Sequence, residues 1–239
     1  MLQHAPVFFS GVRIAHALLL TQSLFLAKMA KEENAFVVCP VPMAAAQIFL
    51  VTPRSAEPAA FPAVLGAVFA AADIAALLVR RHERSEADYR ALVGAVLPVA
   101  QDAGCAVLVE DDAALARALG ADGVHVSGNF RAIRDALAAV KPDLIVGAGP
   151  ARTRHEAMTI GELGVDYIFF GDLDQPADAP AREMGAWWSE TFEVPAVLSG
   201  AAGEDAAGCE FLALGEGFWA GGEPPAVLAA RAASALETA

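Results

Sequence analysis

The sequence predicts an α/β protein of the (β/α)8 class, the TIM barrel, preceded by an N-terminal extension. Eight short segments after residue 46 are apolar on both faces and rich in β-branched or aromatic residues, which is typical of parallel strands covered by helices. Helical patterns alternate with these segments. The turn sequences LGAD at 119–122 and LGVD at 163–166 each lead into a strand, which indicates a repeated unit.

The individual elements follow from this alternation. We expect strands at 48–52, 76–80, 106–110, 123–126, 144–147, 167–170, 196–199 and 211–214. We expect helices at 59–72, 86–102, 112–119, 130–139, 153–163, 180–191 and 223–237. The stretch after the seventh strand is too short for more than one turn of helix. Eight such units make a compact barrel, because about 250 residues are typical of this fold.

Turn residues mark the ends of several helices. Gly120 and Gly164 are expected to end helices in the left-handed conformation, which glycine adopts without steric cost. Asp122 and Asp166 then occupy the tight turn before the next strand. Pro98 falls inside the second helix and removes a backbone donor there, so we expect a kink.

An open, doubly wound sheet is the alternative fold for alternating strands and helices. A dinucleotide-binding sheet of that kind needs a glycine-rich loop after its first strand. The corresponding loop reads TPRS at 52–55 and contains no glycine. The barrel is therefore favoured.

Two regions are expected, an extension at 1–45 and a barrel domain at 46–239. The apolar stretch at 7–30 is interrupted by polar residues at positions 13, 16, 22 and 28, and a membrane span needs about 20 apolar residues. We therefore expect no membrane span. A short signal-peptide core at 14–27, an amphipathic helix packed on the body or on a partner, and a poorly ordered extension remain open.

Composition excludes several classes of protein. Hydrophobic residues make up 56% and charged residues 19% of the chain, which excludes disorder for most of it. A net charge of -13 argues against nucleic-acid binding and against docking on anionic membranes. The three cysteines have no spacing that indicates a zinc site or a disulfide framework. A reducing, cytoplasmic location is expected.

The active site of such a barrel lies at the C-terminal ends of the strands. The third strand ends in Glu110, Asp111 and Asp112. Adjacent acids repel one another unless they are solvated or share a cation, and their oxygens suit Mg²⁺. Asp111 is the candidate metal ligand, Glu110 a candidate polar or catalytic residue, and Asp112 the expected cap of the next helix.

Three loops are candidates for binding phosphate. The loop after the fifth strand offers Gly149, Arg152, Thr153 and Arg154 at a helix N-terminus, where backbone N–H groups and arginines favour anions. An ordinary loop with solvated arginines is the alternative. The loops after strands seven and eight, where these barrels commonly hold a phosphate, offer the small residues Ser199, Gly200 and Gly215. Plain tight turns are the alternative there.

Arg80 and His82 follow the second strand, and His125 lies within the fourth. Alternation places His125 on the face opposite Val124 and Val126, so its side chain can point into the barrel. A hydrogen-bonded structural histidine is the alternative.

The motifs IFLVTP at 48–53, GADGVHV at 120–126 and GVDYIFFG at 164–171 resemble the thiamine phosphate synthase/TenI family of (β/α)8 barrels. The resemblance covers nearly the whole barrel. It implies Mg²⁺-dependent coupling of a hydroxymethylpyrimidine diphosphate to a thiazole phosphate, with pyrophosphate leaving. The implied partner is thus a small phosphorylated heterocycle. The oligomeric state is open, a homo-oligomer included.

Position by position, the family pattern survives only in part. Arg80 matches the family's arginine after strand two, while His82 stands at its diphosphate-binding lysine. Asp111 matches a metal-binding aspartate, and Glu110 replaces an asparagine. The family's second metal-binding aspartate would fall near residues 129–130, which are Asn and Phe. Ser199 and Gly200 stand at its paired glycines.

Three functions remain open on these residues. The first is a divergent thiamine phosphate synthase. The second is an enzyme of the thiazole tautomerase branch, which needs a general base such as His125 or His155. The third is a non-catalytic barrel that binds a phosphorylated metabolite or a protein partner.

Overall fold

A computed structural model describes residues 45–238 of the chain, and within it eight parallel strands close into a barrel. The strands follow one another around the ring in sequence order, and the last pairs with the first. The predicted (β/α)8 fold is confirmed. The interpretations of the N-terminal extension concern residues that lie outside the described part.

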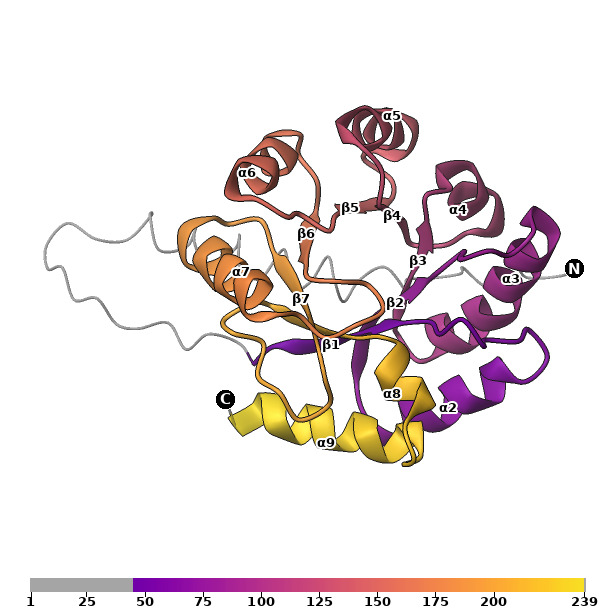
Figure 1. Ribbon diagram of the computed structural model, residues 1–239. Coiled ribbons are helices and arrows are strands. Elements are labelled where there is room, and N and C mark those ends of the chain that lie inside the picture. Colours follow the sequence, from indigo (N-terminus) through magenta and orange to yellow (C-terminus); the bar gives the residue numbers. More distant parts are fainter. Residues whose placement is uncertain (1–44, 239) are drawn as a thin grey trace, which may run out of the picture.

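The strands are β1 (Gln47–Val51), β2 (Ile74–Val79), β3 (Ala106–Glu110), β4 (Gly123–Val126), β5 (Ile145–Ala148), β6 (Tyr167–Phe170), β7 (Ala196–Gly200) and β8 (Phe211–Leu214). The helices are α2 (Phe61–Ala71), α3 (Glu86–Asp102), α4 (Ala113–Leu119), α5 (Phe130–Val140), α6 (Arg154–Glu162), α7 (Ala179–Thr191), α8 (Glu216–Ala220) and α9 (Pro225–Thr238). Figure 1 shows the helices arranged around the strands, with α2 beside α9. The short α8, which follows β8, was not predicted.

Local signals set the ends of these elements. Asp112 caps α4 by accepting a hydrogen bond from the Leu115 N–H at 2.8 Å, as expected. Gly120 ends α4 with φ of 75°, and Gly164 lies in the left-handed region after α6. Helix α3 continues through Pro98 as far as Asp102.

Strand alternation divides the core into two layers. Outward-facing residues such as Val124 and Val126 pack against the helices. Inward-facing residues, among them Phe49, Leu108 and Tyr167, form a separate cluster inside the barrel. Gly147 makes room for the Tyr167 ring, because a Cβ on Gly147 would lie 1.8 Å from the Tyr167 Cζ. The interior is thus filled with side chains, and a ligand site has to lie at the mouth.

Within residues 45–238, no helix combines the length and the apolar character that crossing a membrane requires.

Candidate active site

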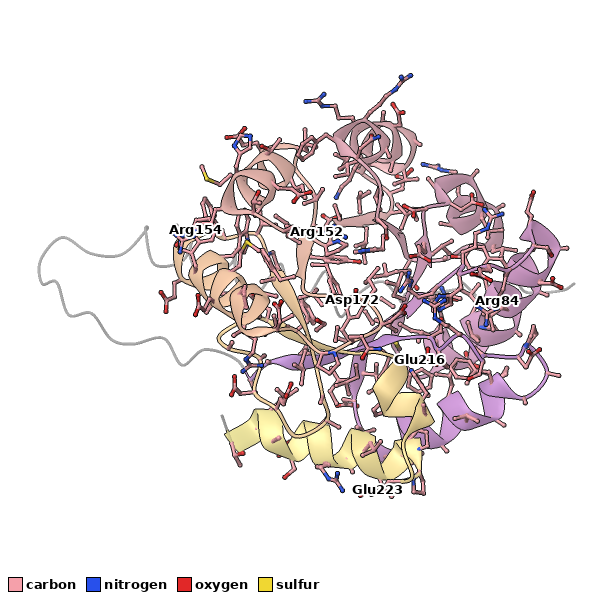
Figure 2. All side chains as sticks on the ribbon, in the orientation of Figure 1. Arg84, Arg152, Arg154, Asp172, Glu216 and Glu223 are labelled. Carbon is pink, nitrogen blue, oxygen red and sulfur yellow. The ribbon has the colours of Figure 1, made fainter. Side chains whose placement is uncertain are left out.

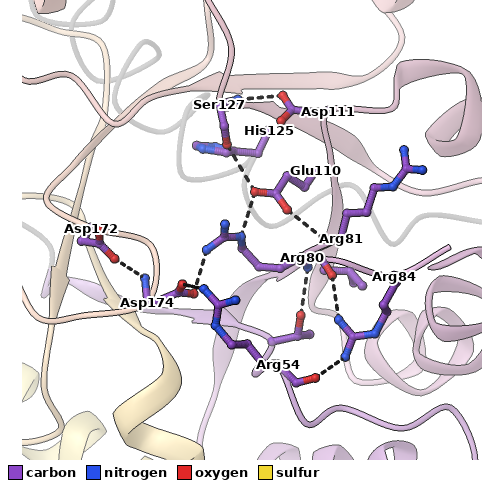
Figure 3. Close-up of polar contacts among 12 residues, drawn as sticks. Arg54, Arg80, Arg81, Arg84, Glu110, Asp111, His125, Ser127, Asp172 and Asp174 are labelled. Carbon is purple, nitrogen blue, oxygen red and sulfur yellow. Dashed lines mark hydrogen bonds and ion pairs between the residues drawn. The ribbon is translucent and has the colours of Figure 1, made fainter. Parts of the chain in front are cut away.

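Arg80 lies at the centre of the barrel mouth between two carboxylates (Figure 3). Its Nε donates to Glu110 Oε1 at 2.8 Å, and its Nη1 donates to Asp174 Oδ1 at 2.8 Å. Its side chain is only 15% exposed, so both ion pairs are largely shielded from water. The arginine expected to meet an anionic substrate therefore already has two anionic partners.

The ends of strands β2 and β3 hold this arginine in place. The Arg80 N–H donates to Thr52 Oγ1 at 2.9 Å, which ties the end of β2 to the end of β1. Glu110 is the last residue of β3, and its Oε2 accepts from the Arg81 N–H at 2.8 Å. Both the backbone of Arg80 and its carboxylate partner are fixed by the strand ends.

A second arginine, Arg54, reaches the same carboxylate from the loop after β1. Its Nη2 donates to Asp174 Oδ2 at 2.7 Å. Its carbonyl oxygen accepts from Arg84 Nη2 at 2.7 Å, and its N–H donates to Glu216 Oε2 at 2.9 Å. These main-chain contacts fix the loop from which the Arg54 guanidinium extends.

Asp174 belongs to the loop between β6 and α7, which crosses the mouth. Asp172 shapes this loop, because its Oδ1 accepts from the N–H groups of Asp174 at 2.8 Å and Gln175 at 3.2 Å. The Asp172 N–H donates to Ser199 Oγ on β7 at 3.1 Å. Leu173 is 7% exposed and joins the cluster inside the barrel. The loop is thus anchored on both sides of Asp174.

A pocket of about 330 Å³ opens beside Asp174, between the ends of β7 and β8. Gly200, Ala201 and Gly215 supply backbone to its wall, and Phe218 of α8 contributes to its lining. Its volume falls in the range of small-molecule sites, which starts at about 300 Å³. One backbone donor of the pocket, the Ala201 N–H, already has an acceptor, because it donates to Glu204 Oε2 at 2.9 Å.

Asp111 is linked to the arginine cluster through Ser127, whose Oγ donates to Glu110 Oε1 at 3.4 Å. It has a left-handed backbone with φ of 52°, and its Oδ1 accepts from the Ser127 N–H at 2.8 Å. Loss of water contact, with a smaller contribution from the Glu110 charge, raises the pKa of its carboxyl above the ordinary value. In residues 45–238, no three His, Cys, Asp or Glu side chains gather as a metal site.

His125 points into the barrel, as alternation predicted, because its ring packs against those of Tyr167 and Phe169, and it is completely buried. Its Nδ1 forms a hydrogen bond of 2.8 Å with the Tyr167 hydroxyl, while its Nε2 has no partner among the described residues. Burial lowers its pKa to about 3, so the ring is neutral at physiological pH. The buried Nε2 of His82 likewise has no hydrogen-bond partner in the described part of the chain, and burial lowers the pKa of His82 too.

The loop after β5 contributes less to the mouth than the sequence suggested. Thr153 caps α6, because its Oγ1 accepts from the Glu156 N–H at 3.1 Å. The Arg152 N–H donates to Glu156 Oε2 at 2.8 Å. The Arg154 guanidinium lies 4.6 Å from the ring centre of Trp187, and Figure 2 shows it at the outer edge of the barrel.

The comparisons with known proteins agree on one family. The model of the thiamine monophosphate synthase family matches residues 48–209. The chain belongs to this family. It is 36% identical over 206 residues to a protein of Hyphomonas neptunium named thiamine-phosphate synthase, covering 80% of this chain and 93% of that protein. A protein of Rhodospirillum centenum with the same name is 34% identical, over 72% of this chain and 89% of its own length.

A solved structure supports the fold. Thiamine phosphate pyrophosphorylase from Pyrococcus furiosus superposes with a TM-score of 0.68 at 19% identity, covering 80% of this chain and 96% of that structure. At this identity the likeness shows the fold alone.

The structure gathers only some of the family positions expected from the sequence. Arg80 and Glu110 meet at the mouth, and Gly200 and Gly215 share the adjacent pocket. Ser199 holds the loop that crosses the mouth. Gly149 lies against Phe169, where a Cβ would come within 2.6 Å of the Phe169 carbonyl oxygen.

Sequence reasoning missed Arg54 and Asp174. Both follow strands, after β1 and β6, so a search for charged residues behind every strand would have found them. It could not have shown that they bind each other, because they lie 120 residues apart in the chain.

Proposed function

We propose that this protein is a thiamine-phosphate synthase, which couples hydroxymethylpyrimidine diphosphate to thiazole phosphate in thiamine biosynthesis. The observation that carries the proposal is that the arginine pair at the barrel mouth and the pocket between the ends of β7 and β8 share one wall. Asp174 joins the guanidinium groups of Arg54 and Arg80 and also lines the pocket formed by Gly200 and Gly215. Two neighbouring places for phosphate suit a reaction that joins two phosphorylated substrates.

The chain's own residues are assigned roles from their positions. Arg80 binds the departing diphosphate and stabilises its growing charge, which is the main contribution a protein can make to such a step. Backbone groups around Gly200 and Gly215 receive the thiazole phosphate, as the corresponding loops do in many barrels. Glu110 orients Arg80, and His125 supports the floor of the site as a neutral ring.

Mg²⁺ fits the residues only as an ion shared with the substrate. Glu110 is engaged by Arg80 and Arg81, which leaves the second carboxylate oxygen of Asp111 as the available ligand. Mg²⁺ in proteins is commonly bound through one or two carboxylates plus substrate phosphates. Asp111 would hold the ion against the diphosphate, where its charge would favour the leaving group.

Several expectations belong to this proposal. Within residues 45–238, Cys105 and Cys209 are buried and form no disulfide, which supports a cytoplasmic location. We assign residues 46–239 to one catalytic domain. The substrates are small phosphorylated heterocycles, with no nucleic acid as partner. His82, Arg152 and Thr153 remain candidate substrate contacts at the rim.

The test supplies both substrates with Mg²⁺ and measures thiamine phosphate and pyrophosphate. We expect both products from the wild type and a loss of about 10- to 100-fold in kcat/KM for Arg80→Gln, the size of a lost charge-assisted hydrogen bond. Arg131→Gln is the control, because the Arg131 side chain is 90% exposed on α5.

Other outcomes would point to other functions. Tight binding of thiazole phosphate without turnover would identify a binding barrel. Mg²⁺-independent isomerisation of a thiazole carboxylate phosphate would identify the tautomerase reaction.

A further inference from the structure

Asp174 poses a problem for any anionic substrate, because it occupies the space between the two arginines of the mouth. We propose that Arg54 and Arg80 form a two-arginine anion site whose resident ligand is Asp174, and that a phosphate or diphosphate group binds there by displacing this carboxylate. The proposed function enters only in naming the incoming group as the diphosphate of the first substrate.

The contacts at Asp174 are those of a bound anion. Each carboxylate oxygen accepts from a different guanidinium, Oδ1 from Arg80 at 2.8 Å and Oδ2 from Arg54 at 2.7 Å. The planar fork of arginine binds carboxylate and phosphate with the same geometry. A phosphate group offers more oxygens and more charge than a carboxylate, so it can take over both contacts.

Arg80 and the backbone of Arg54 are held by contacts that do not involve Asp174. Arg80 remains bound through Nε to Glu110, which is itself held by the Arg81 N–H. The loop of Arg54 is fixed by Glu216 and Arg84 through main-chain atoms. Arg80 therefore stays in position without Asp174, while the exposed guanidinium of Arg54 can turn from a fixed backbone toward an incoming anion.

The Asp174 carboxylate, in contrast, can leave the two guanidinium groups by rotation of its side chain, without a movement of its backbone. Its N–H donates to Asp172 Oδ1 at 2.8 Å, and its carbonyl oxygen accepts from the Glu216 N–H at 3.2 Å. These two contacts hold its backbone without involving its carboxylate. Since Asp174 also lines the neighbouring pocket, the exchange changes the wall that the second substrate meets.

The exchange makes Asp174 a specificity-determining residue. A singly charged carboxylate ligand gains nothing by replacing another carboxylate. Groups that carry two or more negative charges gain additional Coulomb attraction from the same pair of arginines. The site should therefore favour phosphate and diphosphate over carboxylates.

The test is the binding of inorganic pyrophosphate to the full chain by titration calorimetry. Asp174→Asn keeps the shape but removes the competing charge, and we expect it to bind pyrophosphate about 10- to 100-fold more tightly than the wild type. Asp174→Ser, with a smaller side chain, should show the same direction. Adding Arg54→Gln to Asp174→Asn should reverse the gain.

The control is Asp143→Asn, which removes the same charge from a residue in the turn before β5, at the opposite end of the barrel. Equal pyrophosphate affinity in Asp174→Asn, Asp174→Ser and the control would overturn the inference. Tighter binding in Asp174→Asn without any thiamine phosphate from the wild type would reject the proposed function alone. Product formation with no gain in affinity would reject this inference alone.

Discussion

Tyr89 shows how one hydroxyl group shapes the mouth. It lies on α3, completely buried, where the pairing of β2 with β3 ends. Its hydroxyl donates to the Val79 carbonyl oxygen at 2.8 Å and accepts from the Glu110 N–H at 2.7 Å. The hydroxyl thereby bridges the two strands just below the ion pair of Arg80 and Glu110.

Tyr89→Phe removes this bridge without changing the packing of the ring. The Glu110 N–H and the Val79 carbonyl then lose a buried partner, and we expect the free energy of unfolding to fall by about 1–3 kcal/mol. The measurement is urea unfolding followed by circular dichroism. Unchanged stability would mean that another donor or acceptor replaces the hydroxyl.

The lowered pKa of the buried His125 ring leads us to expect that the stability of the protein depends on pH. Its pKa is about 3 in the folded protein against an ordinary value of 6.5, so the unfolded chain binds more protons between these values. Stability therefore falls as the pH drops below 6.5, by up to about 1.4 kcal/mol per pH unit from this group.

Unfolding of wild type and His125→Asn between pH 5 and pH 8 tests this expectation. The asparagine retains a group near the Tyr167 hydroxyl but does not titrate. Its unfolding free energy should depend less steeply on pH than that of the wild type. Identical slopes would contradict the assignment.

Some residues could be identified from the sequence, and others could not. The cap at Asp112 and the left-handed Gly120 depend on neighbours within a few positions, and both predictions are confirmed. Tyr89 has partners on two other elements, 10 and 21 residues away. A local pattern contains no information on such contacts.

At the scale of elements, three acids tie neighbouring strands together at the bottom of the barrel. Asp122 accepts from the Val107 N–H at 2.8 Å, Asp166 from the Val146 N–H at 2.7 Å, and Glu210 from the Ala196 N–H at 2.7 Å. Each acid precedes one strand and binds the start of the strand before it. The turn motif seen in the sequence therefore has a structural role.

Asp166→Ala tests this role. The Val146 N–H loses its acceptor and Lys141 loses its ion pair, so we expect a loss of about 1–3 kcal/mol in unfolding free energy. Asp143→Ala is the matched control, because its carboxylate is 64% exposed, and a change within about 0.5 kcal/mol is expected. Equal effects of both substitutions would contradict the role of Asp166.

The predicted strands and helices lie within two residues of those observed, because the apolar periodicity that indicates them is also what buries them. Helix α8 was missed. It has only five residues, and Gly217 interrupts any helical pattern. Its position depends instead on the packing of Phe218, which is 5% exposed.

At the scale of the whole molecule, the ring closes within residues 47–214. The fold could be predicted because each unit repeats the same pattern. The arrangement of charges at the mouth could not, because it combines the last residue of β3 with loops after β1, β2 and β6 that are distant in the chain. Their pairing depends on the closed ring itself.

A chain limited to residues 46–239 tests the domain boundary. We expect it to fold with a far-ultraviolet circular dichroism spectrum typical of a (β/α)8 barrel, because it contains all eight strands. Its pyrophosphate affinity should match that of the full chain. Aggregation of the shortened chain, with the full chain folded, would place part of the domain before residue 46.

The Tyr167 ring that takes the space above Gly147 has a consequence for how this scaffold can diversify. A substrate cannot enter a barrel interior that side chains already fill. Its recognition therefore depends on the loops at the C-terminal ends of the strands. New specificities can then arise by exchanging loop residues while the scaffold beneath them keeps its sequence.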